Sequence, residues 1–139
     1  KTMADLSITA ANVVGVSSVR TEKVTAGTTI TAGQAVYKDA GDSNKAKLTD
    51  ADASDAASVC DGIATHAALD GQPLVIQTQG IINVGATLVV GEVYMGSGTA
   101  GKIAPHGDFT TGDRATIIGI AETAANLRLH LRSSKTTRA

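Results

Sequence analysis

The chain has 139 residues, a formal net charge of −1 and very few aromatic residues, with no Trp, one Phe and two Tyr. Its length suits one domain with a hydrophobic core. The balanced charge does not favour nucleic acid or an acidic membrane surface as a partner. The sequence contains no run of 18 apolar residues, so it does not predict a transmembrane helix. Cys60 is the single cysteine, which excludes an internal disulfide.

The first residues predict an extended arm, 1–24, outside the main domain. Such an arm either adds an edge strand to its own sheet or lies across a neighbouring subunit. We expect its apolar residues Leu6, Ile8, Val13 and Val14 to contact a partner, pairing edge to edge with a strand of another subunit. The alternative, an arm that completes its own barrel, stays open.

The chain start lacks the basic-then-apolar order of a signal peptide. The order Met3-Ala4-Asp5 is typical of a natural start. Lys1 and Thr2 are then either a cloning remnant or the end of a processed leader.

Two phrases occur twice in the next segment, the single β domain expected at 25–132. "GTTITAGQAVY" at 27–37 returns as "GATLVVGEVY" at 85–94, and "GIATHAA" at 62–68 returns as "GIAETAA" at 119–125. The offset is 58 residues at the first phrase and 57 at the second. We therefore predict a duplication, with repeat 1 at about 27–77 and repeat 2 at about 85–131. Two units are too few for a solenoid, so two interlocked halves around a pseudo-twofold axis are expected.

The elements of repeat 1 can be followed in chain order. Gly27 and Gly33 bracket a short strand, and Val36 begins the next. Asp50 to Cys60 is rich in Ala and predicts a short helix capped by an Asp. A further strand starts at Gly62, where glycine indicates a bulge or a close backbone approach. Leu69 to Gln72 is a hairpin turn signal.

Repeat 2 ends in a strand of clear alternation. Leu127, Leu129 and Leu131 alternate with Arg128, His130 and Arg132, a period typical of an antiparallel strand with one buried and one charged face. The last residues, 133–139, predict a disordered polar, basic tail. Together these features predict an all-β fold of two pseudo-symmetric repeats with an extended N-terminal arm and at most one or two short helices.

The residues that could carry chemistry do not form a recognisable set. His66, His106 and His130 share no near spacing, so a metal site is not expected. Cys60 ends an Ala-rich segment and is expected to be a small buried hydrophobe rather than a nucleophile. We expect no catalytic, cofactor-binding or metal-binding residues, and hence no enzyme.

Two local motifs have simpler interpretations than ligand binding. The acidic residues Asp50, Asp52, Asp55 and Asp61 lack the central Gly and terminal Glu of a calcium loop, so helix capping and a solvated face are expected. Gly96–Lys102 lacks the spacing of a phosphate-binding loop and is expected to be a turn.

The tail carries three basic residues, Arg132, Lys135 and Arg138. Three charges on a nearly neutral chain are weak support for nucleic-acid binding. An acidic protein surface and simple solubility are alternative roles for these charges.

Four phrases resemble one family of viral proteins: "ITAGQAVYKDA", "DGIATHAALDGQPLVIQTQG", "VGEVYMGSGTAGKIAP" and "GDRATIIGIAETAANLRLHL". They are similar to the small capsid decoration, or cement, proteins of tailed bacteriophages. The resemblance covers roughly 27–131 and consists of turn and strand phrases.

This resemblance implies a β-barrel or β-tulip domain on the outer capsid surface of the virion, made in the host cytoplasm and often trimeric. The implied partners are the major capsid protein and further copies of the chain, with neither nucleic acid nor membrane. The family has no catalytic residues to carry over and needs no cofactor. Phage head fibres and some tail components use similar phrases, so a receptor- or carbohydrate-binding module of that kind is the alternative.

Overall fold

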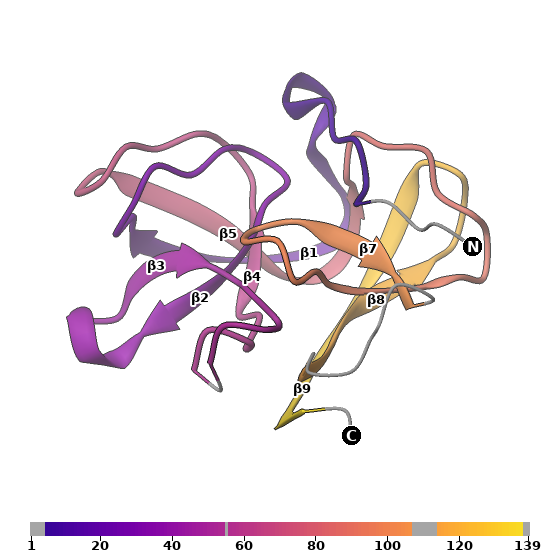
Figure 1. Ribbon diagram of the computed structural model, residues 1–139. Coiled ribbons are helices and arrows are strands. Elements are labelled where there is room, and N and C mark those ends of the chain that lie inside the picture. Colours follow the sequence, from indigo (N-terminus) through magenta and orange to yellow (C-terminus); the bar gives the residue numbers. More distant parts are fainter. Residues whose placement is uncertain (1–4, 55, 107–113, 138–139) are drawn as a thin grey trace.

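The computed structural model describes residues 5–54, 56–106 and 114–137, with the backbone alone at 134–137. The expectations for Lys1 to Ala4, for Asp55 and for Arg138 lie outside these residues. The fold is nearly all β (Figure 1). Its strands are β1 (Val14–Thr25), β2 (Ala35–Asp39), β3 (Lys45–Leu48), β4 (Gly62–Ala64), β5 (Pro73–Asn83), β6 (Val93–Gly96), β7 (Ile103–Pro105), β8 (Arg114–Ala121) and β9 (Asn126–Thr137). Two 3₁₀ turns, η1 (Ala10–Asn12) and η2 (Ala40–Asp42), are the described helical segments.

The strands form one curled antiparallel sheet with the order β3-β2-β4-β5-β9-β8-β6-β7, and β1 pairs with β5 beside this path. The sheet curls into a half-barrel, with β2 and β3 on one side and β8 and β9 on the other (Figure 1). When β2, β3, β4 and β5 are matched with β6, β7, β8 and β9 in turn, the strand order read from one edge of the sheet is the same as that read from the other edge. The all-β class and the barrel-like curl predicted from the sequence are confirmed.

Equivalent residues of the two halves make the same backbone hydrogen bonds. In the first half the Gly33 N–H donates to the Ala64 carbonyl at 2.8 Å, and the Ala64 N–H donates to Gln34 at 2.9 Å. In the second half the Gly91 N–H donates to Ala121 at 2.9 Å, and the Ala121 N–H donates to Glu92 at 3.0 Å. A repeated unit would produce this match, and the duplication itself stays a prediction.

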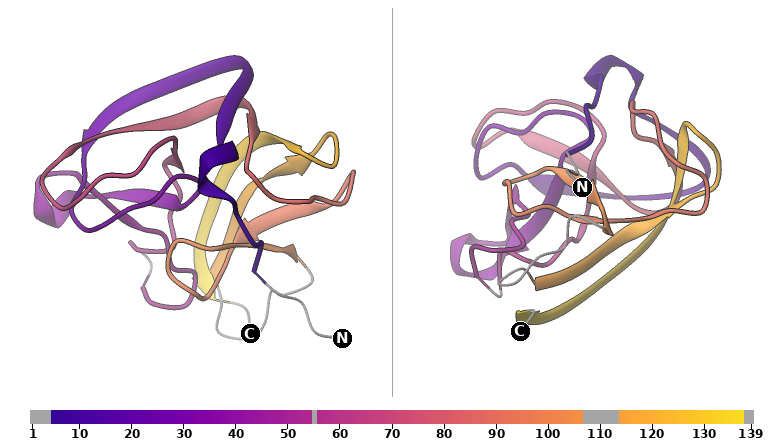
Figure 2. Two further views of the ribbon diagram at one scale, coloured as in Figure 1. Left: turned by 90° about the horizontal axis from the view of Figure 1, so that it is seen from above. Right: turned by 45° about the vertical axis from the view of Figure 1, so that its right-hand side comes forward.

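Strand β5 joins the two halves. Near its start it pairs with β4 through Gln77 and Ile76, and near its end it pairs with β9 through Ile81–Asn83. Its other edge pairs with β1 along its whole length, and the two strands lie side by side in Figure 2. Between the two pairings lies Gly80, at a φ of +93°. A Cβ there would lie 2.3 Å from the Ser18 carbonyl oxygen of β1, so the close approach of β5 to β1 at this position requires glycine.

The core consists of two apolar clusters that follow the two halves. The smaller cluster packs Ile30, Leu74 and Ile76 with small residues of the first half. The larger includes Tyr94 and Ile118 of the second half, and it reaches into the first half through Ala35 and Ile63. Because the chain has few rings, Ile, Leu, Val and Ala provide most of the buried apolar surface.

Two equivalent glycines lie where strands approach closely, as the sequence predicts for the first of them. A Cβ on Gly62 would lie 2.9 Å from the Gln77 carbonyl oxygen, and one on Gly119 would lie 2.2 Å from the Arg128 carbonyl oxygen. Real side chains do not tolerate the second distance. Each glycine therefore lets its strand pack against a neighbouring backbone.

The N-terminal arm differs from the sequence expectation of a segment outside the domain. Residues 14–24 belong to β1, which is rich in Val and Thr and is hydrogen bonded to β5. The Leu6 N–H donates to the Ile103 carbonyl at 2.7 Å, so the preceding residues are also tied to the sheet. The boundary expected at residue 24 therefore falls within a strand.

Two further expectations are wrong. Asp50 to Cys60 forms turns rather than a helix in its described residues, because the Asp50 carboxylate accepts the Asp52 N–H and the Ser54 hydroxyl accepts the Ala57 N–H. The tail expected at 133–139 continues β9 to Thr137, where it pairs with β8. Ladder hydrogen bonds use backbone groups, so a run of Ser and Thr can continue a strand.

Across the described residues, none of the helical segments has the length and apolar character needed to cross a membrane.

Candidate functional site

The three histidines lie apart in the fold. His66 accepts the Val75 N–H through Nε2 at 3.0 Å and so supports a turn. His106 lies 3.5 Å from the Glu92 carboxylate, and His130 is exposed on β9. In the described part of the chain, no three His, Cys, Asp or Glu residues are grouped so that they could hold a metal ion.

Cys60 is buried, with 4% of its surface exposed, and its thiol lies 3.4 Å from the Gly62 carbonyl oxygen as a donor. Burial disfavours the thiolate and raises the pKa of Cys60 to about 12. Since the thiolate is the reactive form, this side chain acts as a small apolar core residue, as the sequence indicates.

The acidic and Gly-rich motifs serve local structure. The Asp61 carboxylate accepts the Lys38 N–H at 2.7 Å, and the Asp50 carboxylate holds the turn described above. Gly96–Lys102 connects β6 and β7 through a turn in which the Ser97 N–H donates to the Lys102 carbonyl at 3.1 Å. These contacts agree with turn roles for both motifs.

The four arm residues expected to contact a partner divide into two groups. Leu6 and Ile8 pack against the larger core cluster, and Val13 is 9% exposed. Val14 is 56% exposed. A partner could reach the first three only if the arm left its place, whereas Val14 is accessible in the structure.

Two equivalent turns show what the arm does. Thr31–Gln34 and Val89–Glu92 each close with an N–H···O bond between their end residues, at 3.3 and 3.0 Å, and each has a glycine of positive φ at its third position. Over the first turn lies the arm: a Cβ on Gly33 would lie 2.7 Å from Ile8. No described residue lies over the second turn, since a Cβ on Gly91 would meet none of their heavy atoms within 4 Å.

The uncovered turn carries the larger apolar side chains. Where the first turn has Thr31 and Ala32, the second has Val89 and Val90, which are 67% and 64% exposed. Ala32 in the covered turn is only 8% exposed. An isolated exposed valine is ordinary, but two adjacent valines at a turn tip leave an apolar surface that a partner could cover.

Most of the exposed large apolar side chains in the described residues belong to two segments of the chain. Of the seven large hydrophobic side chains exposed in the described residues, two are in this turn and three, Val14, Val16 and Val19, are in the first half of β1. The outer edge of β1 has no ladder partner among the described strands. Its second half carries Arg20, Glu22 and Lys23, charges of the kind that discourage edge pairing, while its first half carries none.

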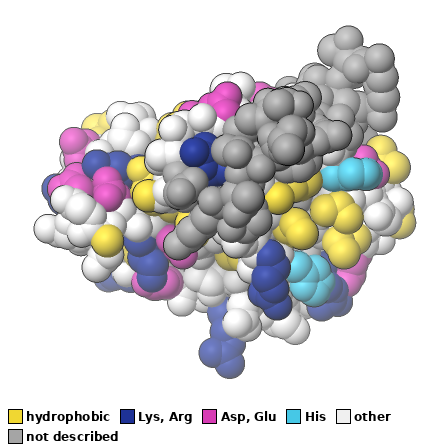
Figure 3. All heavy atoms as spheres, turned by 60° about the horizontal axis from the view of Figure 1, so that its bottom comes forward, with side chains coloured by type: hydrophobic (Ala, Val, Ile, Leu, Met, Phe, Trp, Pro, Cys, Tyr) yellow, Lys and Arg dark blue, Asp and Glu magenta, His cyan; other side chains and the backbone are white. Residues whose placement is uncertain are grey.

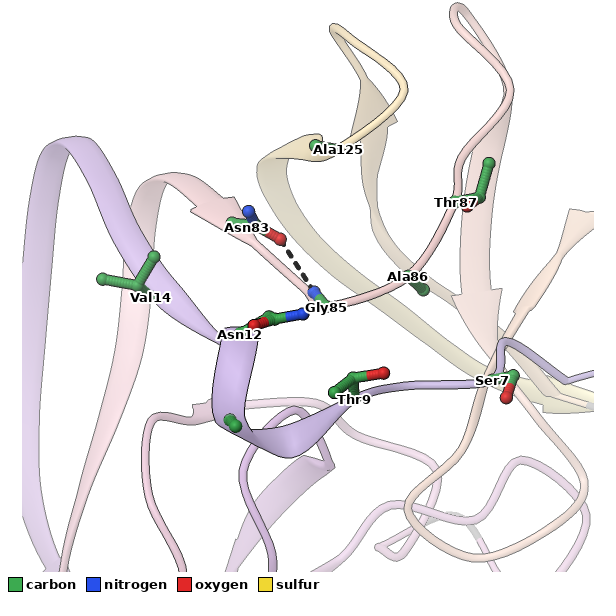
Figure 4. Close-up of a pocket in the computed structure, with 10 residues that line it drawn as sticks. Ser7, Thr9, Asn12, Val14, Asn83, Gly85, Ala86, Thr87 and Ala125 are labelled. Atoms are coloured by element: carbon green, nitrogen blue, oxygen red, sulfur yellow. Dashed lines mark hydrogen bonds between the residues drawn. The ribbon is translucent and has the colours of Figure 1, made fainter.

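A shallow hollow of about 620 Å³ lies beside Val14, and Thr87, which precedes the Val89–Glu92 turn, also lines it (Figure 4). Its walls are η1 with the start of β1, the connection Asn83–Thr87, and the β8–β9 turn at Ala125. The Thr9 N–H donates to the Gly85 carbonyl at 2.7 Å and fixes the arm across its floor. The lining is of small polar and apolar side chains and carries no charged group.

This arrangement can support adhesion. We name the exposed valines of β1, the Val89–Glu92 turn and the hollow beside them the crown surface. On the face drawn in Figure 3, Lys, Arg and His side chains border a hydrophobic area. Sequence reasoning did not single out Val89 and Val90, although comparing them with Thr31 and Ala32 of the first phrase would have done so.

Comparison with protein-family models, with curated proteins and with solved structures gives no match to this chain.

Proposed function

We propose that the chain is a decoration protein of a tailed-phage head, which binds the outside of the assembled capsid and stabilises contacts between major capsid subunits. The observation that carries the proposal is the bare Val89–Glu92 turn, whose equivalent in the first half is covered by apolar residues of the arm. The phrases shared with decoration proteins direct the proposal to a capsid.

The crown surface gives this adhesion a physical basis. Burying a valine side chain completely contributes about 1.5–3 kcal/mol, and Val89 and Val90 are both largely exposed in the isolated chain. One such contact gives weak binding. A shell that offers many identical sites gains avidity when subunits engage neighbouring sites together.

Binding of this kind would stabilise the shell by linkage. A protein that binds only the assembled lattice shifts the equilibrium towards that lattice. The proposed partners are the major capsid protein and two further copies of this chain, in a trimer on the outer capsid surface. The free edge at Val14–Val19 is the second proposed contact, by addition to a strand of the capsid or of an adjacent copy.

The test is co-sedimentation of the purified chain with expanded, undecorated phage heads, counting bound copies per major capsid subunit. Saturation at a fixed ratio is expected for the native sequence. The double variant Val89→Ser/Val90→Ser should bind at least about tenfold more weakly, because two buried valines would be lost. Leu69→Ser is the matched control, since Leu69 is 59% exposed in a hairpin of the first half and should bind normally.

Deleting residues 3–20, most of the arm that is expected from the sequence to contact a partner, would not test the proposal cleanly. It would remove Val13 from the core and half of β1 from the sheet, so folding and binding would be lost together. Equal binding by the native chain and the Val89→Ser/Val90→Ser variant, or no binding by either, would contradict the proposal.

A head-fibre or tail module that binds carbohydrate is the second candidate. The hollow of the crown surface favours it, because Ser7, Thr9 and Asn12 present polar groups there that could bond to sugar hydroxyls (Figure 4). A glycan array with the native chain and with Asn12→Ala tests this alternative. Binding of a glycan that Asn12→Ala weakens would support it, and an empty array would remove it.

A further inference from the structure

A second hollow lies between β5 and β9 and shares no lining residue with the crown surface. It is a groove of about 440 Å³, lined by Thr78–Gly80 of β5, Arg128–Arg132 of β9 and Ser18 of β1. We name it the β5–β9 groove. We propose that it binds an extended acidic segment of another protein chain, added as a strand beside β9.

The groove exists because β5 and β9 diverge. They pair only at Ile81–Asn83 with Asn126–Arg128, while β9 continues to pair with β8 as far as Thr137. Beyond Arg128, the edge of β9 that faces β5 therefore has no ladder partner among the described strands. At about 3.3 Å per residue, the open edge at Leu129–Arg132 could pair with a short extended peptide.

The β5 wall of the groove is also open. Residues 78–80 lie between the pairing with β4 and the pairing with β9, so this stretch lacks a ladder partner on that side in the described structure. The Thr78 hydroxyl already donates to the Arg20 carbonyl at 3.4 Å, and the Gln77 side-chain amide donates to the Gln79 carbonyl at 3.0 Å. The Gln79 side chain remains as a polar group of this wall, so an added peptide would bond mainly to the open edge of β9.

Charge decides the chemistry of the occupant. Arg128, His130 and Arg132 lie on the exposed face of β9, and none of the nine lining residues carries a carboxylate. Arg128 is already paired with the Glu122 carboxylate. The Arg132 guanidinium bonds to the Leu131 carbonyl at 3.0 Å, which holds it along the strand. A segment with Glu or Asp at alternate positions would place its carboxylates beside the guanidinium groups of Arg128 and Arg132, with the His130 ring between them on the same face.

A protein segment suits the groove better than nucleic acid does. Single-stranded nucleic acid is usually held by aromatic side chains on which bases stack, and no aromatic residue lines this groove. An exposed strand edge, in contrast, binds peptides through backbone hydrogen bonds. The inference does not depend on the capsid proposal, because a free peptide can test it.

The probe is an eight-residue peptide of alternating Glu and Thr, titrated into the full ¹⁵N-labelled chain and followed by amide chemical shifts. Shifts should concentrate at 78–80 and 129–132. Arg132→Glu and, separately, His130→Glu should weaken binding by about fivefold or more, since each places a carboxylate in the groove. Lys102→Glu, an exposed cation outside the groove, should leave the affinity within about twofold.

A second peptide separates strand addition from charge attraction. Alternating Glu and Pro has the same charge but lacks half of the N–H donors, so it should bind about fivefold more weakly. Equal binding of the two peptides, unchanged binding by Arg132→Glu, or shifts outside the groove would overturn the proposal. So would tighter binding of an eight-nucleotide oligothymidylate at the same groove.

Discussion

Gly119 provides a sharp test of the sheet, because a single methyl group should push two strands apart. Gly119→Ala would place a Cβ 2.2 Å from the Arg128 carbonyl oxygen and 3.1 Å from Leu127 Cγ. The first contact is to backbone, which cannot rotate away as a side chain can. Strands β8 and β9 would have to separate near the Gly119–Leu129 pair.

The expected cost follows from two effects. Overpacking a filled site costs about 1–3 kcal/mol, and weakening one ladder hydrogen bond adds about 1 kcal/mol. Gly119→Ala should therefore lower the free energy of unfolding by about 2–4 kcal/mol. For a domain of this size that corresponds to a fall of roughly 10 °C in Tm.

Urea unfolding followed by far-UV circular dichroism measures this loss, and Gly96→Ala is the matched control. Gly96 also lies in a strand, but a Cβ there would be 3.4 Å from the nearest heavy atom, an ordinary contact. The control should change stability by less than about 1 kcal/mol. If Gly119→Ala proved as stable as the native chain, the close pairing of β8 and β9 would be refuted.

Three further predictions concern single contacts. Val13→Ala should lower the free energy of unfolding by about 1–3 kcal/mol because Val13 is buried. Val14→Ala should change it by less than about 0.5 kcal/mol, and the urea unfolding midpoints of the two variants measure the difference. Glu22→Gln should cost less than about 1 kcal/mol, measured with and without 1 M salt, because both side chains of the Lys38–Glu22 pair remain partly exposed to solvent and salt. The pKa of Cys60 in the folded chain, about 12, lies above the ordinary value of a free thiol. The stability that the protonated thiol contributes is therefore present below about pH 9 and lost as the pH rises towards 12. Over this range the urea midpoint of the native chain should fall more steeply than that of Cys60→Ala.

Local patterns in the sequence predicted much of the sheet. The alternation of Leu127 and Leu129 with Arg128 and His130 appears in the structure as buried and exposed faces of β9. The turn predicted at 69–72 closes with a bond from Gln72 N–H to Leu69 at 2.9 Å. These features depend on residues that are close together along the chain, so one sequence is enough to predict them.

Features that depend on distant contacts were missed. The Ala-rich segment 50–60 has helix propensity, but side-chain bonds from Asp50 and Ser54 favour turns. The sequence left open whether the arm joins its own sheet or contacts a partner, because nothing in its own residues indicates that Ile8 packs over Gly33. The strand at 133–137 forms because β8 offers a backbone partner, which polar side chains do not reveal.

The candidate surfaces were equally hard to predict. The crown surface arises from an asymmetry between similar turns, one covered by the arm and the other bare at Val89 and Val90. The residues of that asymmetry are visible in the repeated phrases, but the cover is not. The β5–β9 groove depends on where two strands stop pairing, and sequence alone does not fix that point.

The most direct test of the adhesion account is hydrogen–deuterium exchange of the chain, free and bound to undecorated phage heads. Binding through the crown surface predicts slower exchange at 14–19 and 86–92 in the bound state, with no change at the first-half hairpin, 66–72. Identical exchange in both states, or protection of 66–72 without protection of 86–92, would contradict the account.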